Sequence, residues 1–156
     1  MHELFEIYID LLPDRRAPEN FEEAFGFRPP AEPLLQPVFE GDAGEPLTDH
    51  VGFKFTEDVL IADVPVLAAM KVRSTPDRDK NQKRVKDVAD IHSLLWHVDD
   101  IAGVIDEMAL YLDSGDIERF DNSVPETLID QAASLISVDS DVVQASTNRL
   151  TRETLP

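Results

Sequence analysis

The sequence contains no cysteine, few glycines and no long apolar run, and each absence excludes a class of protein. Without Cys among its 156 residues, the chain can form neither a disulfide framework nor a Cys-ligated zinc site. The six glycines do not cluster into a phosphate-cradling loop, and the motifs HExxH and GxSxG are missing. No apolar run approaches the roughly 18 residues of a membrane span, and acids stand where a signal peptide carries basic residues. We therefore expect a soluble, cytoplasmic protein with no membrane partner.

Basic residues are also scarce. Lys and Arg number 14 against 32 Asp and Glu, which gives a net charge of -18. The acids are spread along the whole chain, which is typical of a surface adapted to high salt, so we expect a halophilic source. This surface argues against binding nucleic acid over a broad area, because phosphates need a basic patch. Basic residues gather only between positions 63 and 97, which hold seven of the 14.

The order of the expected elements predicts an α+β fold. Period-two and short apolar runs predict strands at 4–12, 34–40, 51–55 and 59–62, the last two as a hairpin, with a turn at 41–44 and a short helix at 19–25. Helical periods and caps predict helices that begin at Asp63, Asp79, Asp100, Ser123 and Ser140. Residues 113–122 are expected to form a loop. We predict a small, mostly antiparallel sheet over residues 3–62, then a helical region over 64–155, in a single domain spanning 1–156.

Three charged residues beside the apolar helical faces are candidates for a site. Lys71 could place its ammonium on a phosphate, or it could be a surface lysine whose stem covers apolar residues. Asp87 and Asp90 share one helix face and could bind a divalent metal or polarise a hydroxyl. Alternatively, they form i,i+4 ion pairs with Lys83 and Lys86 on a solvated face.

Three further residues have more than one interpretation. Asp10 ends the first apolar strand, where a carboxylate can bind a metal on the open face of a sheet or simply face solvent. His92 falls within the apolar arc of its helix, which favours a core or half-buried histidine over a metal ligand. Trp96 is interpreted as a core residue rather than a stacking platform.

Together these residues resemble minimal nucleotidyltransferase-like proteins, the group within the polymerase-β-like superfamily that includes the AbiEii toxins. That family has a lysine helix of the form P-x-L-x-A-x-K, which here is Pro65-Val-Leu-Ala-Ala-Met-Lys71. It is followed by a helix with K/R-D-x-x-D-L, which here is Lys86-Asp87-Val-Ala-Asp90-Ile91. The string FEIYIDLLP is similar to the strand that carries the superfamily's third carboxylate, here Asp10. The resemblance covers residues 3 to 97.

The resemblance implies transfer of a nucleotidyl group from an NTP with Mg²⁺. The residues that would contact the nucleotide are Lys71, Arg78, Arg84 and Lys86. The catalytic carboxylates would be Asp10, Asp87 and Asp90, with Asp10 as the metal ligand. One of the two helical carboxylates would act in the active site and the other as its structural partner.

In the superfamily, a Gly-Ser turn followed by a D-x-D pair precedes the strand that carries the third carboxylate, and no such signature is found ahead of Asp10 in this sequence. Because they supply the phosphate contacts and most of the metal charge, we expect no nucleotidyl transfer by this chain alone. It would be the later part of a longer enzyme, or a remnant that works as a binding module. The implied partners are an NTP, an RNA or protein acceptor, and a second copy or a cognate protein paired at a sheet edge. The alternative is a non-catalytic interaction or regulatory domain of a halophile, with no nucleotide site.

Overall fold

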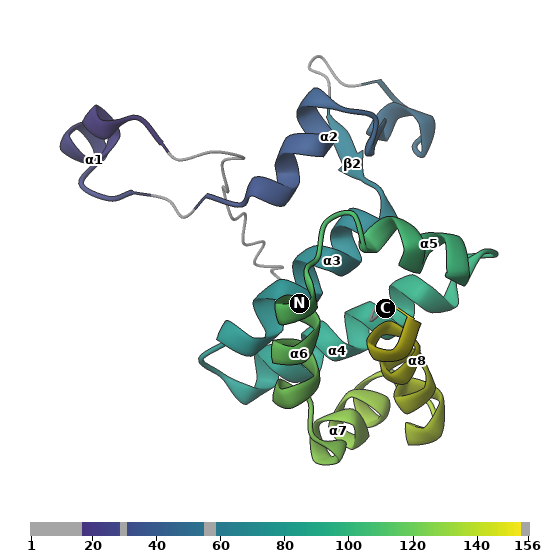
Figure 1. Cartoon of the computed structure of the whole chain (residues 1–156). Coiled ribbons are helices and arrows are strands. Elements are labelled where there is room, and N and C mark those ends of the chain that lie inside the picture. Colours follow the sequence, from purple (N-terminus) through teal and green to yellow (C-terminus); the bar gives the residue numbers. More distant parts are fainter. Residues whose placement is uncertain (1–16, 29–30, 55–58, 154–156) are drawn as a thin grey trace, which may run out of the picture.

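The computed structural model describes residues 17–28, 31–54 and 59–153. Within them the fold is α+β, with a small antiparallel sheet followed by a helical region, as predicted (Figure 1). The α-helices are α1 (Glu19–Phe25), α2 (Gln36–Glu40), α3 (Val64–Ser74), α4 (Asn81–Trp96), α5 (Ile101–Met108), α6 (Ser114–Ser123), α7 (Glu126–Ile136) and α8 (Ser140–Glu153). The strands are β1 (Gly44–Pro46) and β2 (Leu60–Ala62), and the 3-10 helices are η1 (Pro33–Leu35), η2 (Leu47–Asp49) and η3 (Thr75–Asp77).

The segment at residues 34–40 is helical, so the predicted edge strand is wrong. Pro33 and Pro37 each lie in the first turn of a helix, where the N–H that proline lacks has no partner to lose. Leu34 and Val38, one helical turn apart, are both buried. The four-residue spacing of these buried side chains is that of a helix, which explains why the segment forms η1 and α2 instead of a strand.

The sheet consists of β1 and β2, paired antiparallel with Gly44 opposite Ala62. The predicted hairpin is wrong over the described residues 51–54, which form no strand, because β2 pairs instead with residues in and just after the predicted turn at 41–44. Gly44 is needed at this position, since a Cβ there would approach Val38 Cγ1 to 2.8 Å. The predicted strand at 4–12 lies outside the described residues.

The predicted loop at 113–122 is a helix, α6, and it carries its own capping box. Asp113 Oδ1 accepts a hydrogen bond from the Asp116 N–H at 2.8 Å, and Asp116 Oδ2 accepts one from the Asp113 N–H at 3.3 Å. The capping box predicted at Ser123 and Glu126 is wrong, because Ser123 is the last residue of α6 and Pro125 is the N-cap of α7. The capping box of α6 has Asp116 at the third helical position, where the usual sequence pattern has Glu or Gln, so the pattern did not identify it.

Replacing Asp113 with alanine is expected to lower the free energy of unfolding by about 1 kcal/mol, because it leaves N-terminal N–H groups of α6 without an acceptor. Asp113→Ser is the matched control, since serine keeps a capping oxygen. Urea denaturation followed by circular dichroism measures both. Equal losses in the two variants would show that the cap does not stabilise α6.

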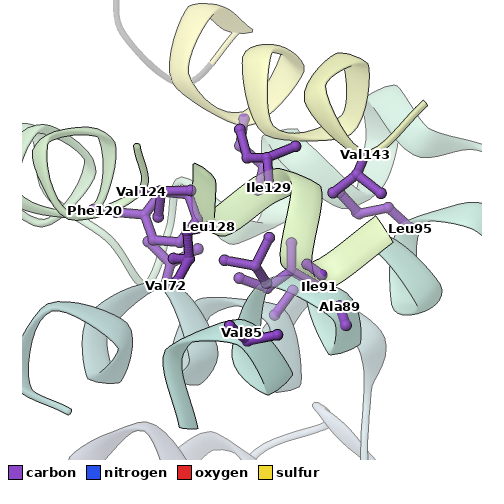
Figure 2. Close-up of a cluster of buried hydrophobic side chains, with 14 of the residues drawn as sticks. Val72, Val85, Ala89, Ile91, Leu95, Phe120, Val124, Leu128, Ile129 and Val143 are labelled. Carbon is purple, nitrogen blue, oxygen red and sulfur yellow. The ribbon is translucent and has the colours of Figure 1, made fainter. Parts of the chain in front are cut away.

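The main hydrophobic core lies among the helices from α3 to α8 (Figure 2). A second, smaller cluster joins α2, the sheet and α3. Helix α3 contributes to both: Ala68 and Val72 face the main core, while Val66 and Ala69 face the smaller cluster. This double packing fixes α3 in place, and with it the base of the Lys71 side chain. By contrast, α1 buries none of its residues and stands apart from the bundle in Figure 1.

Most predicted inward positions of the helices are buried, with two clear exceptions. Trp96 is 63% exposed, so its interpretation as a core residue is wrong. Leu135 of α7 is also exposed. His92 is buried, as predicted. No helix of the described residues combines the length and apolar character needed to cross a membrane.

Candidate functional site

Helices α3 and α4 bring the candidate residues together across the short helix η3. Thr75 ends α3, and its Oγ1 donates a hydrogen bond to the Lys71 carbonyl at 2.7 Å. Arg84 of α4 donates from Nε to the Arg78 carbonyl at 3.1 Å and from Nη2 to the Pro76 carbonyl at 3.4 Å. These side-chain to backbone bonds hold the connection in one conformation, so that α3 and α4 lie against each other.

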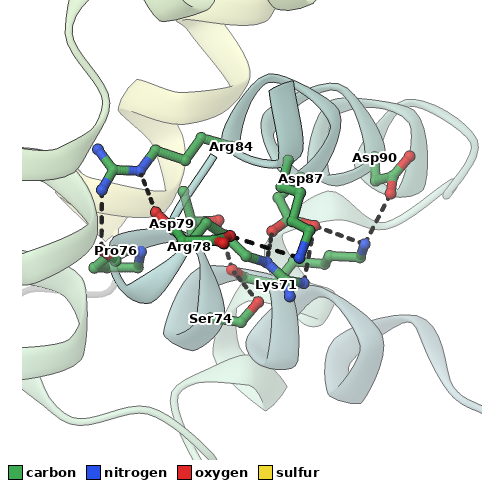
Figure 3. Close-up of polar contacts among 10 residues, drawn as sticks. Lys71, Ser74, Pro76, Arg78, Asp79, Arg84, Asp87 and Asp90 are labelled. Atoms are coloured by element: carbon green, nitrogen blue, oxygen red, sulfur yellow. Dashed lines mark hydrogen bonds and ion pairs between the residues drawn. The ribbon is translucent and has the colours of Figure 1, made fainter. Parts of the chain in front are cut away.

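An ion cluster forms where the two helices meet (Figure 3). Lys71 Nζ lies 2.8 Å from Asp87 Oδ1 and 2.8 Å from Asp90 Oδ2. Arg78 Nε lies 2.6 Å from Asp87 Oδ2. Two cations and two carboxylates are therefore linked in one network, which we call the Lys71 cluster. Lys71, Asp87 and Asp90 are the residues that the lysine helix and the K-D-x-x-D helix were predicted to supply.

The two carboxylates of the Lys71 cluster differ in burial. The Asp87 side chain is 3% exposed, whereas that of Asp90 is 37% exposed. A buried carboxylate is stable only when cations or hydrogen-bond donors satisfy it, and Lys71 and Arg78 do so for Asp87. Asp87 is therefore the buried carboxylate of the cluster and Asp90 the accessible one.

The environment keeps the ammonium of Lys71 charged. Burial by itself would lower the pKa of Lys71, but the hydrogen bonds and negative charges of Asp87 and Asp90 outweigh it and raise that pKa above its ordinary value. Two of the three ammonium hydrogens are used in these bonds. Among the described residues no acceptor is found for the third hydrogen, so the ammonium can donate it to an oxygen of a ligand.

Lys71 and Asp90 also line a pocket of about 450 Å³ between the start of α3 and the end of α4. Its remaining walls are mainly apolar and include Val64, Leu67 and Leu94. A volume of this size is within the range of small-molecule sites, in which a few polar groups among apolar walls fix the ligand. The arrangement can therefore hold a small anion at its polar end, against the Lys71 ammonium.

The helical carboxylates do not fit a magnesium ion in this arrangement. Asp87 Oδ1 accepts from Lys71 and, at 3.4 Å, from Arg78 Nη2, while Oδ2 accepts from Arg78 Nε. A Mg²⁺ ion bound at Asp87 would have to displace both cations. Nowhere in the described part of the chain do three His, Asp or Glu side chains gather closely enough to hold a metal. Asp10, predicted to be catalytic and the metal ligand, lies outside the described residues, and its role stays a prediction.

Arg84 and Lys86, the other residues predicted to contact a nucleotide, lie outside the Lys71 cluster. Arg84 binds backbone carbonyls, so its guanidinium organises the α3–α4 connection. Lys86 is exposed on α4 and is not part of the Lys71 cluster. The predicted i,i+4 pair of Lys83 with Asp87 is not found among the described residues, since Lys83 lies 3.6 Å from Asp79 Oδ1 instead. The interpretation of Asp87 and Asp90 as members of i,i+4 pairs on a solvated helix face is therefore not supported for Asp87, which binds Lys71 of α3 and Arg78 instead.

Sequence reasoning missed a polar pocket of about 280 Å³ beside η3. Arg119 of α6 lies in its lining, with Nη2 2.6 Å from Asp77 Oδ1. Arg73 of α3 lines it as well and lies 3.7 Å from Glu32 Oε1. Because α6 was predicted to be a loop, no pattern could place Arg119 opposite η3.

No protein-family model matches the chain, and comparisons with curated proteins and with solved structures also find no match. The resemblance to nucleotidyltransferase-like proteins therefore stays a prediction, and the Lys71 cluster with its pocket is the feature from which a function is inferred.

Proposed function

We propose that this chain is a nucleotidyltransferase-like domain that binds the phosphates of an NTP at Lys71. The observation that carries the proposal is the meeting of Lys71 with Asp87 and Asp90, with Lys71 and Asp90 in the lining of a pocket. A lysine held by two carboxylates is positioned before the ligand arrives, and it keeps one hydrogen for a phosphate oxygen. Phosphate binding of this kind needs no rearrangement of the cluster.

The proposed function is binding without transfer of the nucleotidyl group. Transfer requires metal-bound carboxylates, and both oxygens of Asp87 are occupied by Lys71 and Arg78. Asp90 remains half-accessible beside the pocket. An RNA or protein acceptor, and a dimer or cognate partner, belong to the same proposal, because an NTP-binding domain without its own transfer chemistry would act together with another chain.

The binding experiment is titration calorimetry with ATP and CTP in the presence of Mg²⁺ and high salt. We expect the wild-type chain to bind, and Lys71→Ala to bind at least about tenfold more weakly, because a charge-assisted phosphate contact is lost. Lys54→Ala is the matched control, since it removes the same charge from an exposed lysine outside the Lys71 cluster. Circular dichroism of each variant shows whether the fold is intact.

Absence of binding by the folded wild-type chain would refute the nucleotide site. A second candidate, a non-catalytic interaction or regulatory domain, would then be favoured. The observation that supports it is the charge balance of the Lys71 cluster, in which Lys71 and Arg78 are paired with Asp87 and Asp90. In that case the cluster would only fasten α3 to α4, and a Lys71→Met variant that kept its fold would keep every binding property of the domain.

A further inference from the structure

A second pocket lies where the end of α4 meets the end of α7 and the start of α8. Its volume is about 410 Å³, also within the range of small-molecule sites. Residues of α7, α8 and the turn between them form its apolar walls, and the groups able to recognise a ligand are His92, Ser93, Trp96 and Asp139. Lys71 and Asp90 are not in this lining, although Ser93 and His97 line both pockets, so the second pocket adjoins the proposed phosphate site without sharing its charged groups.

His92 presents a hydrogen-bond acceptor to this pocket. Its Nδ1 lies 2.9 Å from Ser146 Oγ, and the Ser146 hydroxyl donates its single hydrogen to the Val142 carbonyl at 3.3 Å. Both contacts are satisfied at once only in the tautomer that carries its hydrogen on Nδ1; we assign this tautomer, in which Nε2 has a lone pair. Burial, and to a smaller extent the neighbouring His97, lowers the pKa of His92, so the imidazole is neutral at physiological pH. Among the described residues, Nε2 has no hydrogen-bond partner, although only 4% of the His92 surface is exposed.

Trp96 supplies a flat aromatic surface at the same place. Its ring lies 5.6 Å from that of His92, between centroids, at an interplanar angle of 36°. A tryptophan that is 63% exposed while lining a pocket leaves much of its ring open to a ligand. The face of an indole ring carries negative electrostatic potential and attracts cations, guanidinium above all.

Two of the other polar groups of the pocket, Ser93 and Asp139, also offer acceptors, and His97 lines the pocket beside them with one donor and one acceptor nitrogen. The hydroxyl of Ser93 donates its hydrogen to the Ala89 carbonyl at 2.9 Å, so only its lone pairs remain for a ligand. The carboxylate of Asp139 forms no ion pair with any described residue and is exposed where it lines the pocket. An acceptor nitrogen, a carboxylate and an aromatic face thus surround one space, in a chain whose net charge is -18.

We propose that this pocket binds a planar cation with N–H donors, of the guanidinium class, stacked on Trp96 and hydrogen-bonded to His92 Nε2 and Asp139. Such a group matches all three features at once: its plane fits the indole, its charge fits the carboxylate and its N–H groups fit the acceptors. A neutral or anionic ligand would leave the negative charge of the Asp139 carboxylate without a positive partner. The apolar walls suit the hydrocarbon stem that carries a guanidinium group in arginine.

The experiment uses the fluorescence of Trp96, which is the single tryptophan of the chain and therefore reports on this pocket alone. The probe is N-acetyl-arginine amide, in which guanidinium is the one charged group, titrated at about pH 8 so that ordinary imidazoles are neutral. We expect a saturable change in emission below about 50 mM probe, the range for a ligand with one side chain. N-acetyl-citrulline amide, planar but uncharged, and N-acetyl-lysine amide, charged but not planar, should each bind at least about fivefold more weakly.

Two substitutions test the contacts. Asp139→Asn should weaken binding of the arginine probe by about tenfold, because a charge-assisted hydrogen bond becomes a neutral one. Asp141→Asn is the matched control: it removes the same charge from an exposed carboxylate two residues away that is not in the lining. His92→Phe keeps an aromatic ring and removes the acceptor. Circular dichroism shows whether this buried substitution disturbs the fold. If it does, the comparison of Asp139→Asn with Asp141→Asn still tests whether the pocket binds the arginine probe.

Two sources of the guanidinium group are separated by adding free L-arginine as a further probe. Tighter binding of the capped probe than of free arginine indicates an arginine side chain of a partner protein, whose backbone is uncharged at that point. Tighter binding of free arginine indicates a small-molecule ligand. The proposal is overturned if the arginine probe gives no saturable change, if the citrulline probe binds equally well, or if Asp141→Asn weakens binding as much as Asp139→Asn.

Discussion

Replacing Asp87 with asparagine is expected to lower the free energy of unfolding by about 3 kcal/mol, because it breaks a buried ion pair by removing one partner. Asparagine has the same shape but no charge. Lys71 and Arg78, which both contact the Asp87 carboxylate, would then repel each other without an intervening anion. Since the whole domain is stabilised by only about 5–15 kcal/mol, this is a large fraction of the total.

The measurement is urea denaturation at high salt, followed by circular dichroism, with Asp90→Asn as the matched control. Asp90 is half-exposed and contacts only one of the cations, Lys71, which keeps its bond to Asp87 in that variant. Its loss should therefore cost about 1 kcal/mol or less. Similar costs for the two variants would show that Asp87 is not the carboxylate that fastens α3 to α4.

Replacing Phe120 with alanine is expected to lower the free energy of unfolding by about 3–5 kcal/mol. Phe120 is the largest fully buried side chain among the described residues, with an exposed fraction of 0%. It brings α6 into the main core beside Val72 of α3 and Leu128 of α7 (Figure 2). Truncation removes most of its apolar area and leaves a cavity that the surrounding helices can close only in part.

The matched control is Phe25→Ala, the same chemical change at a residue of α1 that is 64% exposed. It should change stability by less than about 0.5 kcal/mol, because little apolar surface is buried there. Denaturant midpoints, compared at constant slope, measure both variants. A loss in Phe25→Ala as large as that in Phe120→Ala would mean that α1 packs against the bundle and that α6 does not anchor the core.

The sequence predicted well wherever an element follows from local rules. Helix α3 has Pro65 in its first turn, as predicted, and α4 buries Val85, Val88 and Ile91 at helical spacing. Helix α5 begins at Asp100, whose side chain accepts from the Gly103 N–H at 3.0 Å. In each case the deciding interactions lie within one or two turns of the chain, so residue order alone is enough to indicate them.

Prediction failed where strands and helices compete over short segments. Residues 34–40 and 51–55 carry apolar residues in runs too short to separate a period of two from one of 3.6. Their structure depends on what covers them: Val38 packs under Gly44, and β2 pairs with β1 across a long connection. Such contacts join residues distant in sequence, and nothing in the residue pattern specifies the partner.

The sequence by itself determined the acidic surface, the α+β order of the elements, and the two helices that carry Lys71, Asp87 and Asp90. Only the tertiary structure decided what those charges do. It buried Asp87 between two cations while leaving Asp90 beside a pocket, and it placed Trp96 on the surface next to His92 and Asp139. The reason is physical: the state and partner of a charge depend on how much water surrounds it and on which groups face it across helices. Both are properties of packing between elements, which local sequence does not contain.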